Sequence, residues 1–275
     1  MDLTLSKYFP HILCMLLALH SSISVVCANS LDKFSVKHLI NISQQNADEI
    51  AQKYQSTGEV INTDYTLSHN SRVNYQKYQF KGMFSAVLYE FIEPTNFTLT
   101  QFDKSAFFKS AVFSREVRFE WAKFKGEANF SHSRFYGSVD FYQSFFKGQP
   151  VSFYGSQFSE RVDFSDAIFE GDLDFSNATV FDGISFYASH FKNKATFYNS
   201  SFNQPVDFSQ SVFDKDVNFS RAIFEHSLNL NGAKFNGKVN FYATRLPKQM
   251  DLTGVQELEH ILDLTNGKPP AYGEQ

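Results

Sequence analysis

The chain has 275 residues, of which 20% are charged and 43% are hydrophobic, and this composition suits a single globular or solenoid domain. Its net charge of −4 provides no basic field to hold a nucleic acid backbone, so we expect no nucleic acid partner. Phenylalanine is strongly over-represented, with 33 residues against a single tryptophan, and such a bias predicts an internal repeat.

Residues 1–28 have the pattern of a secretory signal peptide. Lys7 precedes the apolar run HILCMLLALHSSISVVCA, which is too short and too polar to span a bilayer well. Because Val26-Cys27-Ala28 has the small-residue spacing of a signal-peptidase site, we predict cleavage after Ala28 and export, either to a periplasm or by secretion. Lipid attachment at Cys27 is the alternative. Cys14 and Cys27 are the only cysteines, so the cleaved chain would have no disulfide, zinc site or thiol nucleophile.

Residues 29–90 are predicted to form an N-terminal capping segment made of a helix and strands. The stretch NADEIAQKYQSTG predicts a short helix, because Asn46 can cap it and Glu49 follows three residues later. The stretch VNYQKYQFKGMFSAVLYEFI then alternates in the way that strands do. A small separate domain with its own ligand is the alternative for this segment.

Large apolar residues then recur at alternating steps of five and six. In VDFSDAIFEGDLDFSNATVF these centres are Phe164, Phe169 and Phe175, and the same steps give two interleaved series of period eleven. A one-residue insertion, marked by Pro150, interrupts both series once. On a helix such residues would scatter around the axis. Short extended segments separated by corners fit the pattern, so we predict an all-β solenoid.

The residue two positions before each centre indicates which side chains point inward. In the first series this residue is usually large or branched, as Val162 is, and in the second series it is small, as Ala167 is. Residues i and i−2 share one side of an extended segment, so both are predicted to point inward. A bulky and a small partner in alternation can fill a narrow interior at native density, so we assign the phenylalanines to a structural core.

The units V-D-F-S-x-A, V-N-F-S-R-A and A-x-F-x-G resemble the pentapeptide-repeat family, in its Phe-centred variant with alternating five- and six-residue units. This resemblance implies a right-handed quadrilateral β-helix. With four faces per coil, residues 91–252 would form about seven coils of about 22 residues. The family also implies that a homodimer can form.

Residues 253–275 are predicted to form a C-terminal capping helix and tail. Thr253 and Gln256 have the spacing of a capping box, and Asn266-Gly267 would end the helix. Together with the N-terminal segment, this helix would cover the exposed ends of the solenoid.

Tyrosine and serine alternate from coil to coil directly after the first-series centres. One face is predicted to carry Tyr142 and Tyr187, and the opposite face Tyr154, Tyr198 and Tyr242. Rings two coils apart would be separated by about 9.6 Å. Two interpretations remain open: the alternation avoids steric crowding, or the rings are platforms that bind a polysaccharide.

Aspartate and asparagine recur one residue before the same centres, where they commonly bond backbone amides at corners. The resemblance to gyrase-protecting pentapeptide proteins would suggest an acidic stripe that mimics DNA. Acidic and basic residues balance over residues 102–252, and export would separate the chain from cytoplasmic DNA enzymes. A gyrase-binding DNA mimic is therefore the least favoured hypothesis.

The histidines of the repeat lie on different coils, and no Ser-His-Asp set, phosphate loop or metal triplet is evident. We therefore expect no enzymatic activity, no cofactor and no metal. The favoured hypothesis is an exported, non-enzymatic β-helical scaffold that binds an unknown protein partner through its lateral faces. Polysaccharide binding by the tyrosine rows is the alternative.

Overall fold

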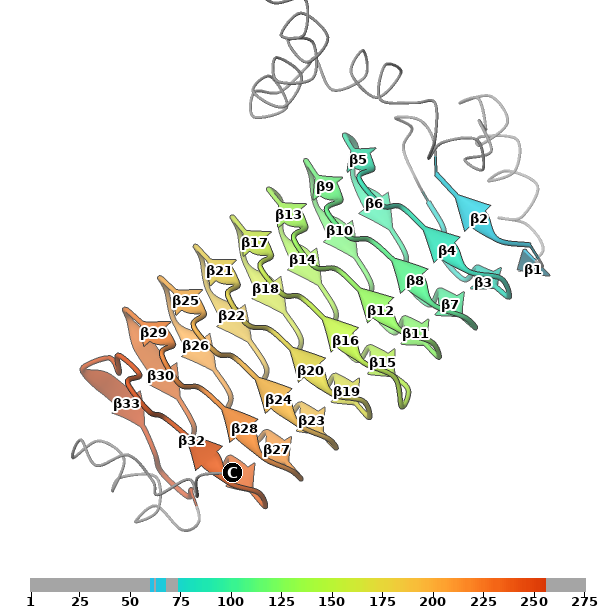
Figure 1. Ribbon diagram of the computed structural model, residues 1–275. Coiled ribbons are helices and arrows are strands. Elements are labelled where there is room, and N and C mark those ends of the chain that lie inside the picture. Colours follow the sequence, from blue (N-terminus) through green and yellow to red (C-terminus); the bar gives the residue numbers. More distant parts are fainter. Residues whose placement is uncertain (1–59, 62, 68–73, 256–275) are drawn as a thin grey trace, which may run out of the picture. The chain divides into compact units, whose positions relative to one another are not determined.

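The computed structural model describes residues 60–61, 63–67 and 74–255, which all belong to one compact unit of the chain. The strands in these ranges are two or three residues long, and each pairs in parallel with strands one coil away (Figure 1). Consecutive strands enter consecutive sheets, so the chain passes through four sheets before it returns to the first. The fold is a right-handed four-sided β-solenoid, as predicted, and these ranges contain no helix.

Two opposite sheets carry the second-series centres. The first sheet contains β1 (Val60–Ile61), β3 (Gln79–Phe80), β7 (Gln101–Phe102), β11 (Lys123–Phe124), β15 (Phe145–Phe146), β19 (Ile168–Phe169), β23 (His190–Phe191), β27 (Val212–Phe213) and β31 (Lys234–Phe235). The third sheet contains β5 (Glu90–Phe91), β9 (Val112–Phe113), β13 (Arg134–Phe135), β17 (Gln157–Phe158), β21 (Thr179–Val180), β25 (Ser201–Phe202) and β29 (Ile223–Phe224).

The other two sheets are followed by the first-series centres. The second sheet contains β2 (Tyr65–Thr66), β4 (Phe84–Ser85), β8 (Ala106–Phe107), β12 (Ala128–Asn129), β16 (Val151–Ser152), β20 (Leu173–Asp174), β24 (Ala195–Thr196), β28 (Val217–Asn218) and β32 (Val239–Asn240). The fourth sheet contains β6 (Thr95–Asn96), β10 (Val117–Arg118), β14 (Val139–Asp140), β18 (Val162–Asp163), β22 (Ile184–Ser185), β26 (Val206–Asp207), β30 (Ser227–Asn229) and β33 (Gln249–Asp251).

Strand pairing confirms the length of the coil and the position of the insertion. Val117 pairs with Val139, 22 residues later, and the same offset recurs in most of the ladders. Ala128 pairs with Val151, 23 residues later, so the extra residue is accommodated at the bend that contains Pro150.

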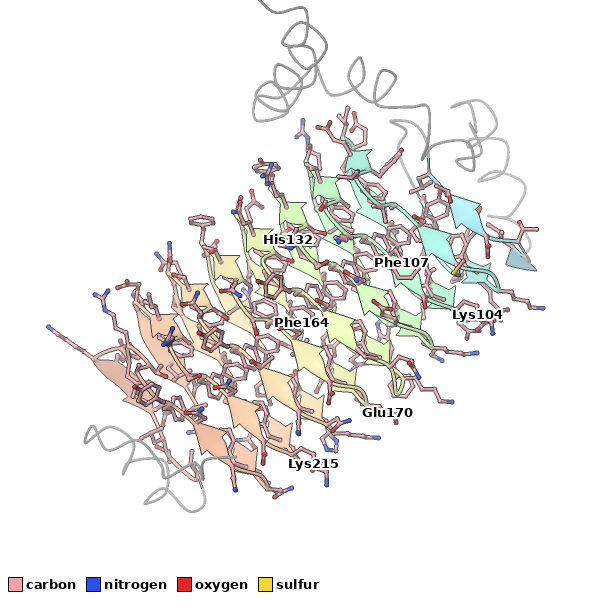
Figure 2. All side chains as sticks on the ribbon, in the orientation of Figure 1. Lys104, Phe107, His132, Phe164, Glu170 and Lys215 are labelled. Carbon is pink, nitrogen blue, oxygen red and sulfur yellow. The ribbon has the colours of Figure 1, made fainter. Side chains whose placement is uncertain are left out.

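The interior consists of stacked phenylalanine rings. Phe141 and Phe164 stack almost parallel in successive coils, with centroids 4.7 Å apart and an interplanar angle of 4°. Phe153, from the opposite sheet, meets Phe164 edge-on at 80°. Figure 2 shows Phe164 inside the solenoid, whereas Lys104 and Lys215 point away from it. Burial of each ring stabilises the fold by roughly 1.5–3 kcal/mol, as expected for a structural core.

Small inward residues fill the space beside these rings. Ala167 is completely buried, which confirms the predicted inward set. Several small positions hold serine, and the buried hydroxyls of most of them bond backbone carbonyls. The Ser189 hydroxyl donates to the Phe164 carbonyl at 2.7 Å and the Ser133 hydroxyl to the Phe108 carbonyl at 2.6 Å.

The two kinds of corner explain the alternating steps of five and six. After each first-series centre the chain makes a tight turn, in which the Phe141 carbonyl, for example, accepts the Ser144 N–H at 3.0 Å. The third residue of this turn is left-handed, with a φ of 52° at Gln143. The wider bend after each second-series centre accommodates the sixth residue.

The sequence register predicted that the regular coils begin at Phe91. In the structure they begin earlier in the chain. β1 and β3 already pair in the first sheet, so its nine strands define eight turns among the described residues. The sequence pattern does not indicate this earlier coil, because the large and small sites are exchanged in it. Ala86 occupies the centre position, where a phenylalanine is usual, and Phe84 lies two residues before it.

Several sequence predictions fall outside the described residues. These are the signal peptide, the cleavage site at Ala28, the helix expected after Asn46 and the part of the C-terminal helix and tail beyond Val255. The prediction that Thr253 begins this helix is wrong, because Thr253 and Gly254 form another tight turn, in which Gly254 is left-handed with a φ of 73°. The division of the chain into domains stays a prediction.

Candidate interaction surface

The predicted tyrosines lie at the tight turns on two opposite sides of the solenoid. Tyr142 and Tyr187 follow β14 and β22 of the fourth sheet, and Tyr154, Tyr198 and Tyr242 follow strands of the second sheet. Tyr154, Tyr187 and Tyr242 are 40%, 46% and 49% exposed, whereas Tyr142 and Tyr198 are half-buried. Because successive coils pair in register, tyrosines two coils apart are separated by about 9.6 Å.

Turn residues of neighbouring coils contact several of these rings. The Arg221 guanidinium lies over the Tyr198 ring, 5.8 Å from its centroid, and donates a hydrogen bond to the Tyr198 hydroxyl at 3.2 Å. The His132 ring meets Tyr154 edge-on at 5.3 Å. One face of Tyr198 is therefore occupied, which weighs against an unbroken row of stacking platforms. Polysaccharide binding stays a prediction.

The polar residues one position before the first-series centres stabilise the same turns. The Asp140 carboxylate accepts the Tyr142 N–H at 2.7 Å, and the Asp163 carboxylate accepts the Ser165 N–H at 2.7 Å. In the same way, a side-chain oxygen accepts the backbone N–H two residues later at Asn96, Asn129, Asp174, Asp207, Asn218, Asn229, Asn240 and Asp251. The prediction that this column bonds corner amides is confirmed.

Asp140 stands in an unusually acidic part of this column. Its pKa is raised to about 6, chiefly by burial; the neighbouring carboxyls of Glu120 and Asp163 contribute to the rise, and the Tyr142 N–H bond opposes it. Asp140 pairs with Asp163 across the ladder, and on its other side with Arg118, whose guanidinium bonds Glu116 at 3.4 Å. The carboxyls of Glu120, Asp140 and Asp163 therefore lie close together, at the fourth sheet and the turn that follows β10.

Sequence reasoning missed two groups of exposed apolar side chains. The first continues the large–small alternation onto the third sheet, where Ile92, Tyr136 and Phe181 follow β5, β13 and β21 and are 41%, 52% and 49% exposed. Ser114 and Ser159 stand between them. The signal was available, because these residues directly follow second-series centres in the way that the tyrosines follow first-series centres.

The second group occupies the left-handed position of the tight turns. Leu88, Leu99 and Trp121 have φ values of 59°, 61° and 59° and are 78%, 44% and 47% exposed. Ordinary side chains disfavour this conformation, which suits glycine and asparagine. Corners in a sequence are indicated by glycine, asparagine, aspartate and serine, so a bulky apolar residue in a turn gives no such signal.

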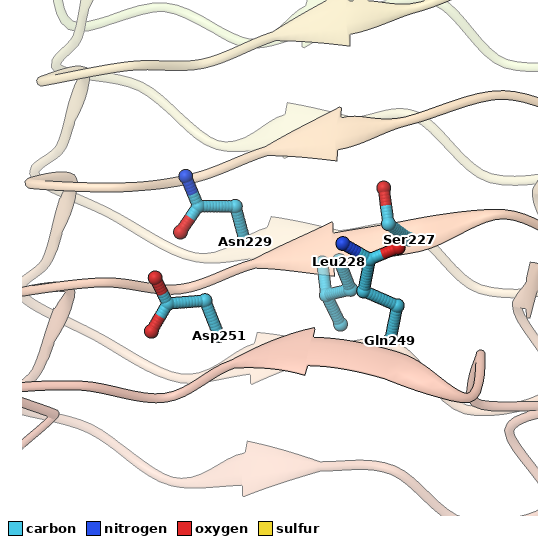
Figure 3. A pocket seen from close by; sticks show the side chains of 5 residues that line it. All are labelled: Ser227, Leu228, Asn229, Gln249 and Asp251. Carbon is cyan, nitrogen blue, oxygen red and sulfur yellow. The ribbon is translucent and has the colours of Figure 1, made fainter.

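Other candidate features of the described ranges are minor. A shallow depression of about 230 Å³ lies between β30 and β33 and is lined by Ser227, Leu228, Asn229, Gln249 and Asp251 (Figure 3). In residues 60–255, as far as they are described, no three histidine, cysteine, aspartate or glutamate side chains are grouped to hold a metal ion. The same ranges contain no helix that is long and apolar enough to cross a membrane.

Comparison with known proteins relates the repeat to a family. A model of pentapeptide repeats, built of nine copies, matches residues 97–144, 130–179 and 178–223. Among solved structures, that of QnrB1, a plasmid-mediated fluoroquinolone resistance protein, matches with 11% sequence identity and a TM-score of 0.18, over 74% of this chain and 96% of that chain. No curated protein matches significantly. Residues 97–223 of this chain are therefore pentapeptide repeats, whose Phe-centred units stack in four parallel sheets.

Proposed function

We propose that the chain is an exported, non-enzymatic β-helical scaffold that binds a partner protein through a lateral face of the solenoid. One observation carries this proposal: aromatic side chains recur every second coil at outward positions that the core does not use, and several of them are exposed. Tyr136 and Phe181 lie on the third sheet, Tyr187 on the fourth, and Tyr154 and Tyr242 on the second. Aromatic side chains are enriched where proteins bind one another.

The outward polar side chains support a scaffold role. At the first-series turns, aspartate, asparagine, serine and threonine side chains are engaged in turn bonds, as Asp207 and Thr196 are. The His190 imidazole pairs with the Asp214 carboxylate at 2.7 Å. These groups are used to hold one coil to itself or to the next, and the exposed aromatic rows are left to contact a partner.

Photo-crosslinking in the native compartment tests the proposal. A benzophenone amino acid is placed singly at Tyr154, Phe181 and Tyr187 of the full chain, and at Lys215 as the control, which points outward from a bend (Figure 2). At least one aromatic position should capture a defined protein that the Lys215 variant does not capture. Capture of nothing, or of the same mixture from all four positions, would contradict a lateral binding face.

Export is tested separately on the same material. The mature protein is isolated and its N-terminal residue is determined by sequencing or by intact mass. We expect a chain that begins at Asn29, whereas a chain that still begins at Met1 in the cytoplasm would reject the export proposal.

A further inference from the structure

An apolar strip crosses three consecutive coils where the fourth sheet turns into the first. Leu99, Trp121 and Tyr142 lie on successive coils, because the Leu99 N–H donates to the Glu120 carbonyl at 2.8 Å and the Trp121 N–H to the Tyr142 carbonyl at 2.9 Å. The Trp121 and Tyr142 rings meet edge-on, with centroids 6.0 Å apart. Two of the three side chains are nearly half exposed, so the strip is open to solvent.

The fold gains nothing evident from a bulky side chain at two of these positions. Leu99 and Trp121 occupy the left-handed place of their turns, which Gly232 and Gly254 occupy in later coils of the same column. A large apolar residue is strained there and exposes its surface to water. Such a conflict between local preference and sequence is typical of a site retained for binding.

Two carboxyls that form no salt bridge among the described residues border the strip. The Glu120 and Asp140 carboxyls are half-buried next to Trp121 and Tyr142, and their proximity contributes to the raised pKa of Asp140. The Arg118 guanidinium bonds Glu116 instead, and Lys77 lies one coil before Leu99 in the same column. A cationic group from a partner would relieve the repulsion between the two carboxyls.

We propose that Leu99, Trp121 and Tyr142, with the Glu120 and Asp140 carboxylates, form a docking surface for a protein segment that presents an arginine or lysine beside an apolar side chain. The apolar side chain packs on Leu99 and Trp121, and the cation lies between the aromatic rings and the carboxylates, where both attract it. This inference rests on the proposed function and adds to it the place on the solenoid and the chemistry of the partner.

The test uses Trp121, which is the only tryptophan of the chain, so its fluorescence reports on this surface alone. A tryptophan-free random peptide library is panned on the full-length protein, and enriched peptides are synthesised with a matched version in which each arginine or lysine is glutamate. The enriched peptides should combine a basic and an apolar residue and should shift Trp121 emission saturably. The glutamate versions should not shift it.

Matched variants locate the binding. Leu99→Asn and Glu120→Gln should each weaken the peptide about tenfold, as expected for residues at the centre of an interface. Leu88→Asn makes the same change at the equivalent turn on the opposite side, and Glu160→Gln removes an exposed carboxylate elsewhere. These two controls should bind as the unchanged protein does.

Three results would overturn the inference. The first is that panning enriches no peptide. The second is that a peptide binds but leaves Trp121 emission unchanged, or that Leu88→Asn weakens its binding as much as Leu99→Asn does. The third is that Trp121 emission shifts when the protein alone is concentrated, which would assign the strip to a second copy. None of these results decides the proposed function, because crosslinking from Tyr154, Phe181 and Tyr187 tests that on other parts of the surface.

Discussion

Individual buried hydroxyls in this solenoid have unequal energetic roles. Ser189 and Ser144 occupy equivalent inward positions and are both fully buried. The Ser189 hydroxyl donates to the Phe164 carbonyl, whereas the Ser144 hydroxyl has no hydrogen-bond partner among the described residues. A buried polar group without a partner has lost its bonds to water and has gained none in return.

Ser189→Ala should therefore lower the free energy of unfolding by about 1 kcal/mol, because one buried hydrogen bond is lost. Ser144→Ala should leave it unchanged or raise it, because an unsatisfied hydroxyl is removed from the same kind of site. Chemical denaturation of the two variants beside the unchanged protein measures both effects. An equal loss in the two variants would contradict this distinction.

The Asp140 carboxyl should make stability depend on pH. Its pKa of about 6 in the folded protein lies above the ordinary value of 3.8, so between these values the folded state retains a proton that the unfolded state has lost. The contribution of Asp140 to the free energy of unfolding is therefore complete below about pH 4, and it is lost as the pH rises through 6. Asp140→Asn keeps an oxygen for the Tyr142 N–H and removes the charge.

This variant should be more stable than the unchanged protein at pH 7.5 and equally stable at pH 4. The gain should be on the order of 1 kcal/mol, after allowance for the screening of a group that is only half-buried. Asp207→Asn is the control, since Ser185 and Asn229 flank it in the ladder and neither is charged. Thermal melts at the two pH values provide the measurement, and a gain at pH 4 as large as that at pH 7.5 would exclude a charge effect.

At the scale of the element, the tight turn is the unit that sets the direction of the chain. Its left-handed third residue recurs after each first-series centre and is occupied by fourteen non-glycine residues among those described. The N–H of this residue also donates to a carbonyl of the next coil, as Gln143 does to the Ser165 carbonyl at 2.9 Å, so the neighbouring coil helps to hold the conformation whatever residue occupies it. The fold therefore tolerates residues at this position that the turn itself disfavours, although each of them adds strain.

Leu88→Asn should stabilise the protein, because asparagine tolerates the left-handed conformation better than leucine does. An increase of about 0.5–1 kcal/mol in the free energy of unfolding is expected, since the strain of roughly 1–2 kcal/mol is only partly relieved. Ile92→Asn, at an exposed residue outside the left-handed position, should change it by less than about 0.5 kcal/mol. A larger effect of the Ile92 substitution in urea denaturation would show that exposure, and not backbone strain, is responsible.

At the scale of the whole molecule, large and small surface residues alternate from coil to coil, so the surface pattern of the described residues repeats every two coils. Deletion of residues 162–205 removes two coils and keeps tyrosine next to serine in each row. Deletion of residues 162–183 removes one coil and places Tyr142 beside Tyr187 and Tyr154 beside Tyr198. If the alternation avoids crowding, the one-coil deletion should melt at a lower temperature than the two-coil deletion, although its chain is longer.

Circular dichroism would first establish that both deletion proteins retain the parallel β structure, and calorimetry would then compare their melting temperatures. A higher melting temperature for the one-coil deletion would mean that adjacent tyrosines stabilise one another. The steric interpretation of the rows would then be rejected.

The fold was predictable from the sequence because inward residues of a short strand repeat every two positions, and Val162 with Phe164 or Ala167 with Phe169 shows this directly. The start of the coils was not, because Phe84 and Ala86 exchange the large and small sites. The candidate surface was predicted in part. Tyr187 follows from the repeat, but the exposure of Trp121 depends on a left-handed turn whose residue type carries no signal.

The parallel ladders also determine how this protein would respond to tension. Each described coil is bonded only to the coil before it and the coil after it, and no bond spans the solenoid lengthwise. A force that pulls the two ends apart would load the ladder bonds of a terminal coil first, while the interior coils remain shielded. Coils would therefore peel away one at a time, each releasing about 22 residues, or roughly 70 Å of chain. The molecule is thus built to yield in equal increments under load, as an extensible tether does.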